Sequence, residues 1–227
     1  PYVFFNDDAQ EYVMILGGRK LDGKKIRVGR TVYFTSKDLK QWDFKGDFWA
    51  PDLFYMHEMP DIFNIGDYWY LLTTEYSDKC KTIYRMSKSL TGPWIAPVDD
   101  AFDGRAYYAA RSFSDGRRRY LFGWVPTKEN DDDLQNWQWG GTLVVHEVHQ
   151  RADGSLGVSI PEGVASAFAK KTSLIASPLT LSSQDSCVAH TLIQTTGDLF
   201  KFEATVQFNE STRAFGVRLF EDEGTGD

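Results

Sequence analysis

Residues 61–72 read DIFNIGDYWYLL, two runs rich in β-branched and aromatic residues that flank a short turn containing Gly66. Such runs favour strands, and a short connection that contains glycine favours a hairpin. The same arrangement recurs at residues 2–16 and 107–124. The sequence therefore predicts three hairpins, and no long window keeps the period of an amphipathic helix.

Another strand-like segment follows each hairpin, so the pattern repeats along the chain. Residues 31–39 precede Trp42, and residues 82–90 precede Trp94. A looser third copy spans residues 142–154. A repeat of about 50 to 60 residues that carries four strands is typical of a β-propeller blade.

The repeats end before the chain does. Three of them fill residues 1–163, fewer than the roughly four to eight blades that close a propeller. In residues 164–227, small residues, Ser and Thr replace the aromatic residues, and alternation returns at 199–208 and 214–220. This alternation favours strands with one buried face, the beginning of a β-sandwich. The sequence thus predicts an all-β chain with a domain boundary after residue 163.

Composition and charge exclude several classes of function. The chain has 32 acidic and 25 basic side chains, and its formal charge of −7 argues against a nucleic-acid partner. No apolar run approaches the roughly 18 residues of a membrane span. Cys80 and Cys187 have no C-x-x-C companion, and His146 and His149 would face opposite sides of a strand. We therefore predict no disulfide framework, no metal site and no cofactor.

The candidate site lies in the aromatic-rich segment 48–63. Glu58 stands two residues before Pro60, among aromatic side chains that could stack on a sugar ring and desolvate the carboxyl group. Desolvation favours the protonated form, which a general acid for a leaving-group oxygen requires. On composition alone, an exposed turn carboxylate is the plainer interpretation of Glu58.

The order of residues favours the catalytic interpretation. The segment Glu58-Met59-Pro60-Asp61-Ile62-Phe63 resembles the Glu-Cys-Pro-Asp-Leu-Phe motif of glycoside hydrolase family 32, the invertases, inulinases and levanases. Residues 102–111 are similar to the family's Asp-x-Gly-x-x-Tyr-Tyr-Ala stretch, and residues 117–124 to its Arg-Arg-x-x-x-Gly-Trp strand. Residues 139–143 and 153–156 match the segment that closes the fifth blade. The matches occur in the family's order.

This resemblance implies a partial five-bladed β-propeller followed by the start of a β-sandwich. It implies retaining hydrolysis of terminal β-fructofuranosyl bonds in sucrose or fructans, without a cofactor and with Glu58 as the acid/base. It also implies that Asp103, Tyr107, Trp124 and His57 bind the sugar. The plainer interpretations are a turn aspartate for Asp103 and core aromatic residues for Tyr107 and Trp124.

The chain also departs from the family pattern. Met59 and His57 stand where the family has cysteine and tryptophan, and His146-Glu147-Val148 replaces a Pro-Arg-Glu sequence. The Trp-Met-Asn-Asp-Pro-Asn segment that carries the nucleophilic aspartate does not occur, and residues 1–4 resemble the continuation of the family's Arg-Asp-Pro motif. We therefore expect a fragment that lacks the N-terminal blades of its parent chain and is inactive alone.

Two alternatives remain open. The first is a non-catalytic sugar-binding or sensing propeller, which is favoured if the natural gene also lacks the nucleophile segment. The second is another five-bladed glycosidase family that acts on arabinan or xylan. The Glu-x-Pro-Asp-x-Phe order that begins at Glu58 argues against this second alternative.

Overall fold

The structure is a computed structural model. It describes residues 1–21, 23, 27–77, 80–103, 106–132, 134–184, 186–194, 197 and 199–219. The chain divides into two units, Pro1–Val164 and Ala165–Asp227, and every strand among the described residues belongs to the first unit. Within the described residues, no helix is long and apolar enough to cross a membrane.

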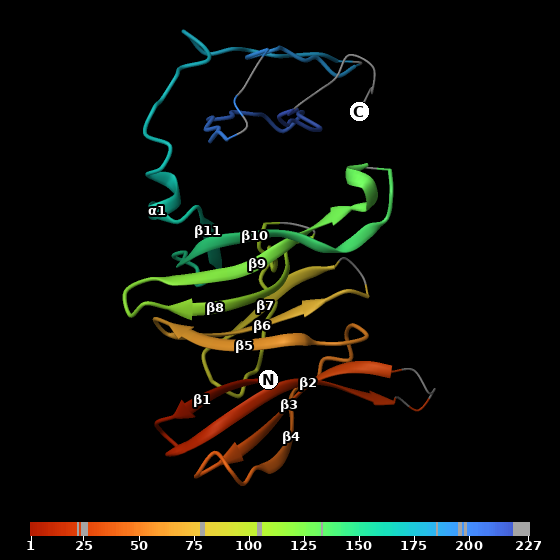
Figure 1. Cartoon of the computed structure of the whole chain (residues 1–227), viewed down its shortest axis with the longest axis vertical. Helices are drawn as coiled ribbons and strands as arrows, with labels where there is room; N and C mark the ends of the chain where they lie inside the picture. The colour runs from red at the N-terminus through yellow and green to blue at the C-terminus, as the bar shows by residue number, and fades with distance from the viewer. Residues whose placement is uncertain are drawn as a thin grey trace. The chain divides into compact units, whose positions relative to one another are not determined.

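In the described part of the chain, the strands form three antiparallel sheets in chain order (Figure 1). The first sheet contains β1 (Tyr2–Asn6), β2 (Glu11–Leu21), β3 (Arg27–Ser36) and β4 (Asp43–Trp49). The second contains β5 (Glu58–Ile65), β6 (Tyr68–Glu75) and β7 (Lys81–Ser87). The third contains β8 (Tyr108–Ser114), β9 (Arg119–Lys128), β10 (Trp137–Gln150) and β11 (Leu156–Ser159). Two short helices, η1 (Glu129–Asp131) and α1 (Glu162–Ala165), accompany the third sheet along the chain.

The three predicted hairpins are confirmed. Strands β1 and β2, β5 and β6, and β8 and β9 pair as antiparallel neighbours. The turn between β5 and β6 contains Gly66 with φ at +56°, a left-handed conformation in which glycine has no Cβ to clash. Turn residues and alternation therefore specify each pair locally.

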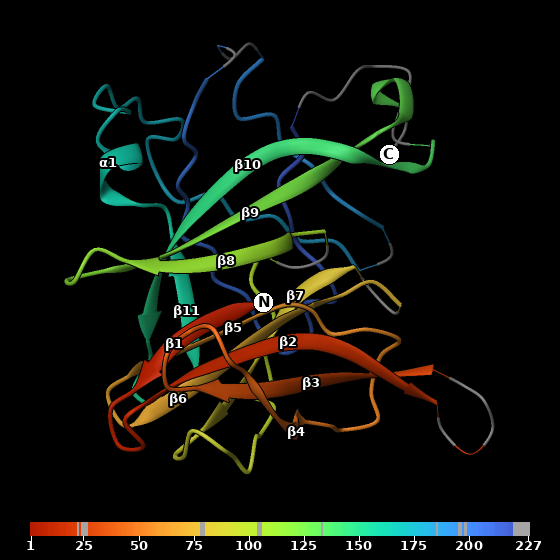
Figure 2. The ribbon, with the colours of Figure 1, turned by 60° about the horizontal axis from the view of Figure 1, so that its bottom comes forward.

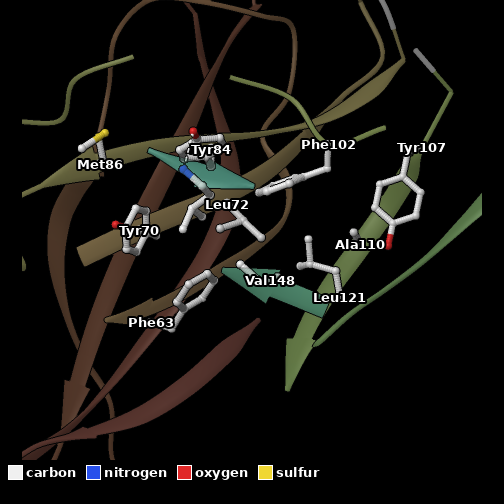
Figure 3. Packing of buried hydrophobic residues seen from close by; sticks show 11 residues of the cluster. Phe63, Tyr70, Leu72, Tyr84, Met86, Phe102, Tyr107, Ala110, Leu121 and Val148 are labelled. Atoms are coloured by element: carbon white, nitrogen blue, oxygen red, sulfur yellow. Dashed lines mark hydrogen bonds between the residues drawn. The ribbon is translucent and has the colours of Figure 1, made fainter. Parts of the chain in front are cut away.

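The middle sheet holds the core because both of its faces are covered. Ile62 and Leu71 pack with Val13 and Ile15 of the first sheet. On the opposite face, Phe63, Tyr70, Leu72 and Tyr84 pack with residues of the third sheet, including Ala110, Leu121 and Val148 (Figure 3). Successive residues of a strand point to opposite faces, so one hydrophobic run supplies two cores.

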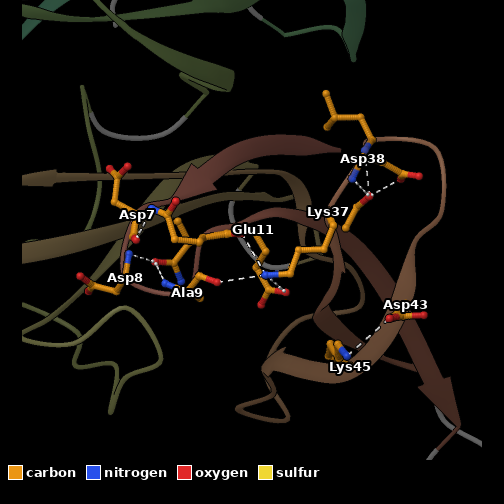
Figure 4. Close-up of polar contacts among 12 residues, drawn as sticks. Asp7, Asp8, Ala9, Glu11, Lys37, Asp38, Asp43 and Lys45 are labelled. Atoms are coloured by element: carbon orange, nitrogen blue, oxygen red, sulfur yellow. Dashed lines mark hydrogen bonds and ion pairs between the residues drawn. The ribbon is translucent and has the colours of Figure 1, made fainter.

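The segments that follow β3 and β7 resemble each other, and in both a serine side chain accepts a hydrogen bond from the backbone of the turn. Ser36 Oγ accepts a hydrogen bond from the backbone of Leu39 at 2.9 Å, and Ser87 Oγ accepts one from Ser89 at 3.1 Å. Lys37 donates to the carbonyls of Ala9 and Gln10, at 3.2 and 2.9 Å, and so ties this turn to the β1–β2 turn (Figure 4). Short polar side chains that bond to nearby backbone explain why serine recurs at this position.

One detail of the predicted repeat is wrong. The middle sheet has three strands rather than four, and the segment after β7 makes only the isolated bridges Met86↔Ile95 and Ile83↔Ala101 among the described residues. Pro93 and Pro97 flank Ile95, and proline has no backbone N–H to donate to a ladder.

The strands predicted at residues 199–208 and 214–220 are also not formed. No described residue between 199 and 219 is in a strand, and residue 220 lies outside the described part of the chain. The rings of Phe208 and Phe215 contact each other at 4.8 Å between centroids. Alternation marks a surface that could be half-buried, but a strand also needs neighbours for its backbone groups, and the sequence pattern did not supply them.

Candidate functional site

Glu58 is the first residue of β5, where the strand is irregular. A register shift separates Glu58 from Asp61, and Met59 between them has φ at +51°. Thr73 Oγ1 donates to the backbone carbonyl of Glu58 at 2.9 Å. Bulges of this kind redirect a side chain. Glu58 is half-buried, so part of this residue is open to solvent.

The side chain of Tyr108, the first residue of β8, donates a hydrogen bond to Glu58 Oε2. The Tyr108 ring is buried and packs edge-on against Trp124 of β9, with 5.5 Å between ring centroids. Burial raises the pKa of Tyr108, and the hydrogen bond to Glu58 raises it further. The phenol therefore keeps its proton and remains a donor to the carboxylate.

Asp61, three residues along the same strand, has a different environment. Its side chain is fully buried, and Oδ2 accepts a hydrogen bond from the Ser112 backbone at 2.6 Å. In the described part of the chain, Oδ1 has no hydrogen-bond partner. Burial raises the pKa of Asp61 above its ordinary value, although the hydrogen bonds of Ser112 and the charges of Arg111 and Arg119 oppose this shift. Asp61 therefore joins the second sheet to the third and presents no oxygen to solvent.

The ring of His57 faces away from solvent, with no exposed area. Its Nδ1 lies 3.2 Å from Thr31 Oγ1, and its Nε2 lies 3.1 Å from the Leu53 carbonyl. Burial lowers the pKa of His57 to about 4, so the ring is neutral at pH 7. In a neutral ring, Nε2 donates to the Leu53 carbonyl and Nδ1 accepts from Thr31 Oγ1. These two hydrogen bonds hold the loop before Glu58 against the first sheet.

Glycines of the first sheet let that loop approach closely. Gly29 N donates to the Phe54 carbonyl at 2.8 Å. A Cβ at Gly17 would lie 1.9 Å from the His57 carbonyl oxygen, and one at Gly29 would lie 2.7 Å from the His57 ring. Only residues without a Cβ allow this contact, which fixes the backbone that enters β5 at Glu58.

The other sequence-predicted residues form a second group. Asp103 Oδ2 lies 3.1 Å from His146 Nε2, and this hydrogen bond lowers the pKa of Asp103. The Tyr107 ring contacts the His146 ring at 4.9 Å between centroids. Tyr107 itself is fully buried, and its hydroxyl donates to the Val144 carbonyl at 3.2 Å. Asp103 is thus the exposed member of this group, and Tyr107 supports it from the core.

The structure brings Glu58, Tyr108 and Trp124 together, and separately Asp103, His146 and Tyr107. Sequence reasoning missed Tyr108, although the pair Tyr107-Tyr108 carried a signal, since two consecutive residues point in opposite directions at a strand. Tyr108 binds Oε2, one of the two carboxyl oxygens of Glu58. No three His, Cys, Asp or Glu side chains among the described residues are grouped as a metal site would require.

Comparisons with known proteins agree with the motif. The family model described as the glycosyl hydrolases family 32 N-terminal domain matches residues 1–154. A sucrose-6-phosphate hydrolase of Vibrio alginolyticus is 28% identical over 216 residues, which are 86% of this chain and 42% of that protein.

Solved structures show the same fold relationship. A sucrose-6-phosphate hydrolase from Lactobacillus gasseri has a TM-score of 0.57 at 20% identity and matches 72% of this chain with 36% of its own. A family 32 β-fructofuranosidase of Bombyx mori has a TM-score of 0.55 at 21% identity, over 72% of this chain and 37% of its own. The chain therefore spans less than half the length of these relatives.

Proposed function

Because this chain belongs to glycosyl hydrolase family 32, we propose that it is the part of a retaining β-fructosidase that carries the general acid/base. The bonds cleaved would be terminal β-fructofuranosyl bonds in sucrose, phosphorylated sucrose or fructans. The observation that carries this proposal is the contact of Tyr108 with the half-buried Glu58.

Glu58 would act in both steps of the reaction. In the first step, its carboxyl proton moves to the glycosidic oxygen as the bond to the fructosyl carbon breaks. The carboxylate that results is stabilised by the hydrogen bond from Tyr108, since bonds to charged acceptors are the stronger ones. In the second step, Glu58 takes a proton from the water that attacks the fructosyl-enzyme intermediate.

The nucleophile must be a second carboxylate about 5 to 5.5 Å from the acid/base. Strands β5 and β6 carry two further carboxyl side chains near Glu58 in the sheet, Asp61 and Glu75, and both are fully buried. Asp61 is also engaged by Ser112. We therefore assign the nucleophile to sequence outside residues 1–227, and expect this chain alone to release no fructose.

The fold supports the same assignment. Strand β5 contacts both β1 and β8, the first strands of the neighbouring sheets, as the inner strands of adjacent propeller blades do. We propose that residues 1–163 are blades three to five of a five-bladed propeller, and that residues 164–227 begin a β-sandwich.

Open apolar surface on the third sheet suggests where the remaining blades would pack. Phe113, Phe122 and Leu143 are 67%, 42% and 65% exposed. Arg111 and Phe122 are cross-strand partners, so their side chains lie on the same face of the sheet. Phe113 is two residues after Arg111 in the same strand and therefore lies on that face as well. The missing N-terminal blades of the parent chain would cover such a face, and without them residues 1–227 should self-associate in sedimentation experiments.

The sugar would contact residues from both groups. Asp103 offers an exposed carboxylate to sugar hydroxyls, and Trp124 lies beside Tyr108. We assign positioning roles to the buried His57 and Tyr107, because their polar atoms already bond to protein.

The test of Glu58 uses the full-length protein that carries this chain. Glu58→Ala should lower kcat on sucrose about 10²-fold or more. Fructosyl fluoride has a leaving group that needs little protonation, so it should still form the covalent intermediate. Azide needs no general base and should restore turnover, giving fructosyl azide with retained configuration.

Glu11→Ala is the matched control, since Glu11 also opens a strand and is half-buried. It should leave kcat near the wild-type value. If Glu58→Ala lowers the melting temperature while kcat per folded molecule is unchanged, Glu58 is a structural residue. A wild-type protein that binds sucrose without cleaving it would instead support a sugar-binding propeller.

A further inference from the structure

The β2–β3 hairpin is the most basic part of an acidic chain. Within residues 17–30, the basic side chains are Arg19, Lys20, Lys24, Lys25, Arg27 and Arg30, against the single acidic residue Asp22. The ladder between β2 and β3 extends to the pair Leu21↔Arg27, whereas β4 pairs only with residues 31–35 of β3, so the hairpin runs on past β4 (Figure 2). The whole chain carries a formal charge of −7, so this local excess of positive charge suits an anion.

Aromatic side chains hold Arg19 of this hairpin in place. Its guanidinium carbon lies 4.1 Å above the centre of the Tyr55 ring. Its Nη2 donates to Tyr76 Oη at 2.7 Å, and the two tyrosine rings contact each other edge-on at 6.2 Å. These contacts orient the planar guanidinium while the residue stays exposed.

Arg19 differs from Arg30 of the facing strand in the charge of its partners. Arg30 is buried and forms ion pairs with Asp47 and Asp52, at 3.7 and 2.5 Å. In the described part of the chain, the partners of Arg19 are the neutral phenols Tyr55 and Tyr76. The positive charge of Arg30 is therefore compensated within the protein, and that of Arg19 is available to a ligand.

The two tyrosines that contact Arg19 belong to segments next to Glu58, the proposed acid/base. Tyr55 lies three residues before Glu58, on the loop that leads into β5. Tyr76 follows the end of β6, two residues after Thr74, which pairs with Glu58. Tyr76 also lies close enough to Tyr108 to influence its ionisation. A general acid stands on the leaving-group side of the scissile bond, so a group beside it meets the leaving sugar.

We propose that Arg19, seated on Tyr55 and Tyr76, binds a phosphoryl group on the leaving-group sugar. This inference rests on the proposed function, and it adds a residue that selects phosphorylated over neutral substrates. Guanidinium is suited to this task because its planar N–H groups match the oxygens of a phosphate in pairs. A neutral glucosyl unit would make no comparable use of an uncompensated charge.

The test compares substrates within one enzyme, so that a general loss of folded protein cancels. For the full-length protein, kcat/KM is measured on sucrose 6-phosphate, which carries the phosphate on the leaving glucose, and on sucrose. Arg19→Ala should lower the ratio of the two values about tenfold or more, as for a lost charge-assisted hydrogen bond. Arg19→Lys should lower it less, about threefold, because the charge remains without the planar group.

Lys20→Ala is the matched control. It removes the same charge one residue away, on the opposite face of β2, and should change the ratio less than about twofold. Sucrose 6′-phosphate, with the phosphate on the fructosyl unit, should gain nothing from Arg19. If Arg19→Ala folds poorly, Tyr76→Phe removes the bond that orients the guanidinium and should lower the ratio in the same direction.

Three results would overturn the assignment of Arg19: an unchanged ratio in Arg19→Ala, an equal loss in Lys20→Ala, or a preference for the 6′-phosphate. Failure of the proposed function gives a different result, namely that the wild type hydrolyses neither substrate. Calorimetric binding of glucose 6-phosphate against glucose then decides the role of Arg19, because it requires no turnover. The proposal is supported if glucose 6-phosphate binds more tightly than glucose and if Arg19→Ala abolishes this difference. It is overturned if the wild type binds both sugars equally.

Discussion

The beginning and the middle of β5 carry two carboxylates in different environments. Glu58 is half-buried at an irregular strand end, and its partner is the side chain of Tyr108. Asp61 is fully buried three residues later, and its partner is the backbone of Ser112 in the third sheet. The two acids of one short motif thus have separable tasks: the first can exchange a proton, and the second holds two sheets together.

Replacement of Glu58 should produce the largest change in activity. Glu58→Gln keeps an oxygen that can accept the Tyr108 hydrogen bond but has no proton to give. We expect kcat of the full-length protein to fall about 10²- to 10⁴-fold. The free energy of unfolding should change by less than about 1 kcal/mol, because the shape and the hydrogen bond are kept. Fructose release and urea denaturation of the same preparation measure both quantities.

Replacement of Asp61 should reverse this pattern. Asp61→Ala leaves the buried Ser112 N–H without its acceptor and removes a side chain that is fully buried between the second and third sheets. We expect the free energy of unfolding to fall by up to about 3 kcal/mol, the usual effect of leaving a buried hydrogen-bond donor without a partner. Denaturant titration measures this loss.

Asp67→Ala is the control for this prediction. Asp67 lies in the exposed turn after β5, where an ion pair with Lys88 should contribute less than about 1 kcal/mol. A loss at Asp61 no larger than that at Asp67 would show that the second and third sheets do not depend on this carboxylate.

Local sequence signals predicted the hairpins of the first unit, and they failed for the two strands predicted in the second unit. The β5–β6 hairpin is specified by its own turn, in which Gly66 takes a left-handed conformation. Residues 199–208 alternate as regularly as this hairpin does, yet no described residue there forms a strand. Alternation describes a face, while a strand requires hydrogen-bond partners.

The candidate site shows the same limit. Glu58 could be recognised because its motif is continuous in sequence. Its contact with Tyr108 joins residues that are 50 positions apart on two different sheets. Sequence alone could not show which member of the Tyr107-Tyr108 pair would face Glu58, because a shift of one residue exchanges the two faces of a strand.

His57, the residue before Glu58, should give the stability of this region a pH dependence. Burial lowers the pKa of folded His57 to about 4, below the ordinary value of 6.5. Between these pH values the unfolded chain binds a proton that the folded chain does not. The free energy of unfolding should therefore fall as the pH drops from about 6.5 to about 4, by up to about 3 kcal/mol.

His57→Gln should remove this part of the pH dependence, as measured by denaturant titration across the same pH range. The exposed His190 provides the control, and His190→Gln should keep the wild-type slope. A slope that is the same in His57→Gln and in the wild type would mean that other groups produce it.

The smallest predicted effect concerns the hydroxyl of Tyr108, which acts through Glu58. Tyr108→Phe keeps the ring against Trp124 and removes the hydrogen bond to the carboxylate. Without that bond the carboxylate is less stable, so kcat should fall about tenfold. The free energy of unfolding should fall by no more than about 1.5 kcal/mol, because a single hydrogen bond is lost. Tyr107→Phe separates this positioning role from packing, since the Tyr107 hydroxyl bonds to Val144 instead. That variant should lower stability by about 1 kcal/mol and leave kcat per folded molecule within about twofold of the wild-type value. Equal kcat values for the two variants would mean that Tyr108 supports the fold and does not position Glu58.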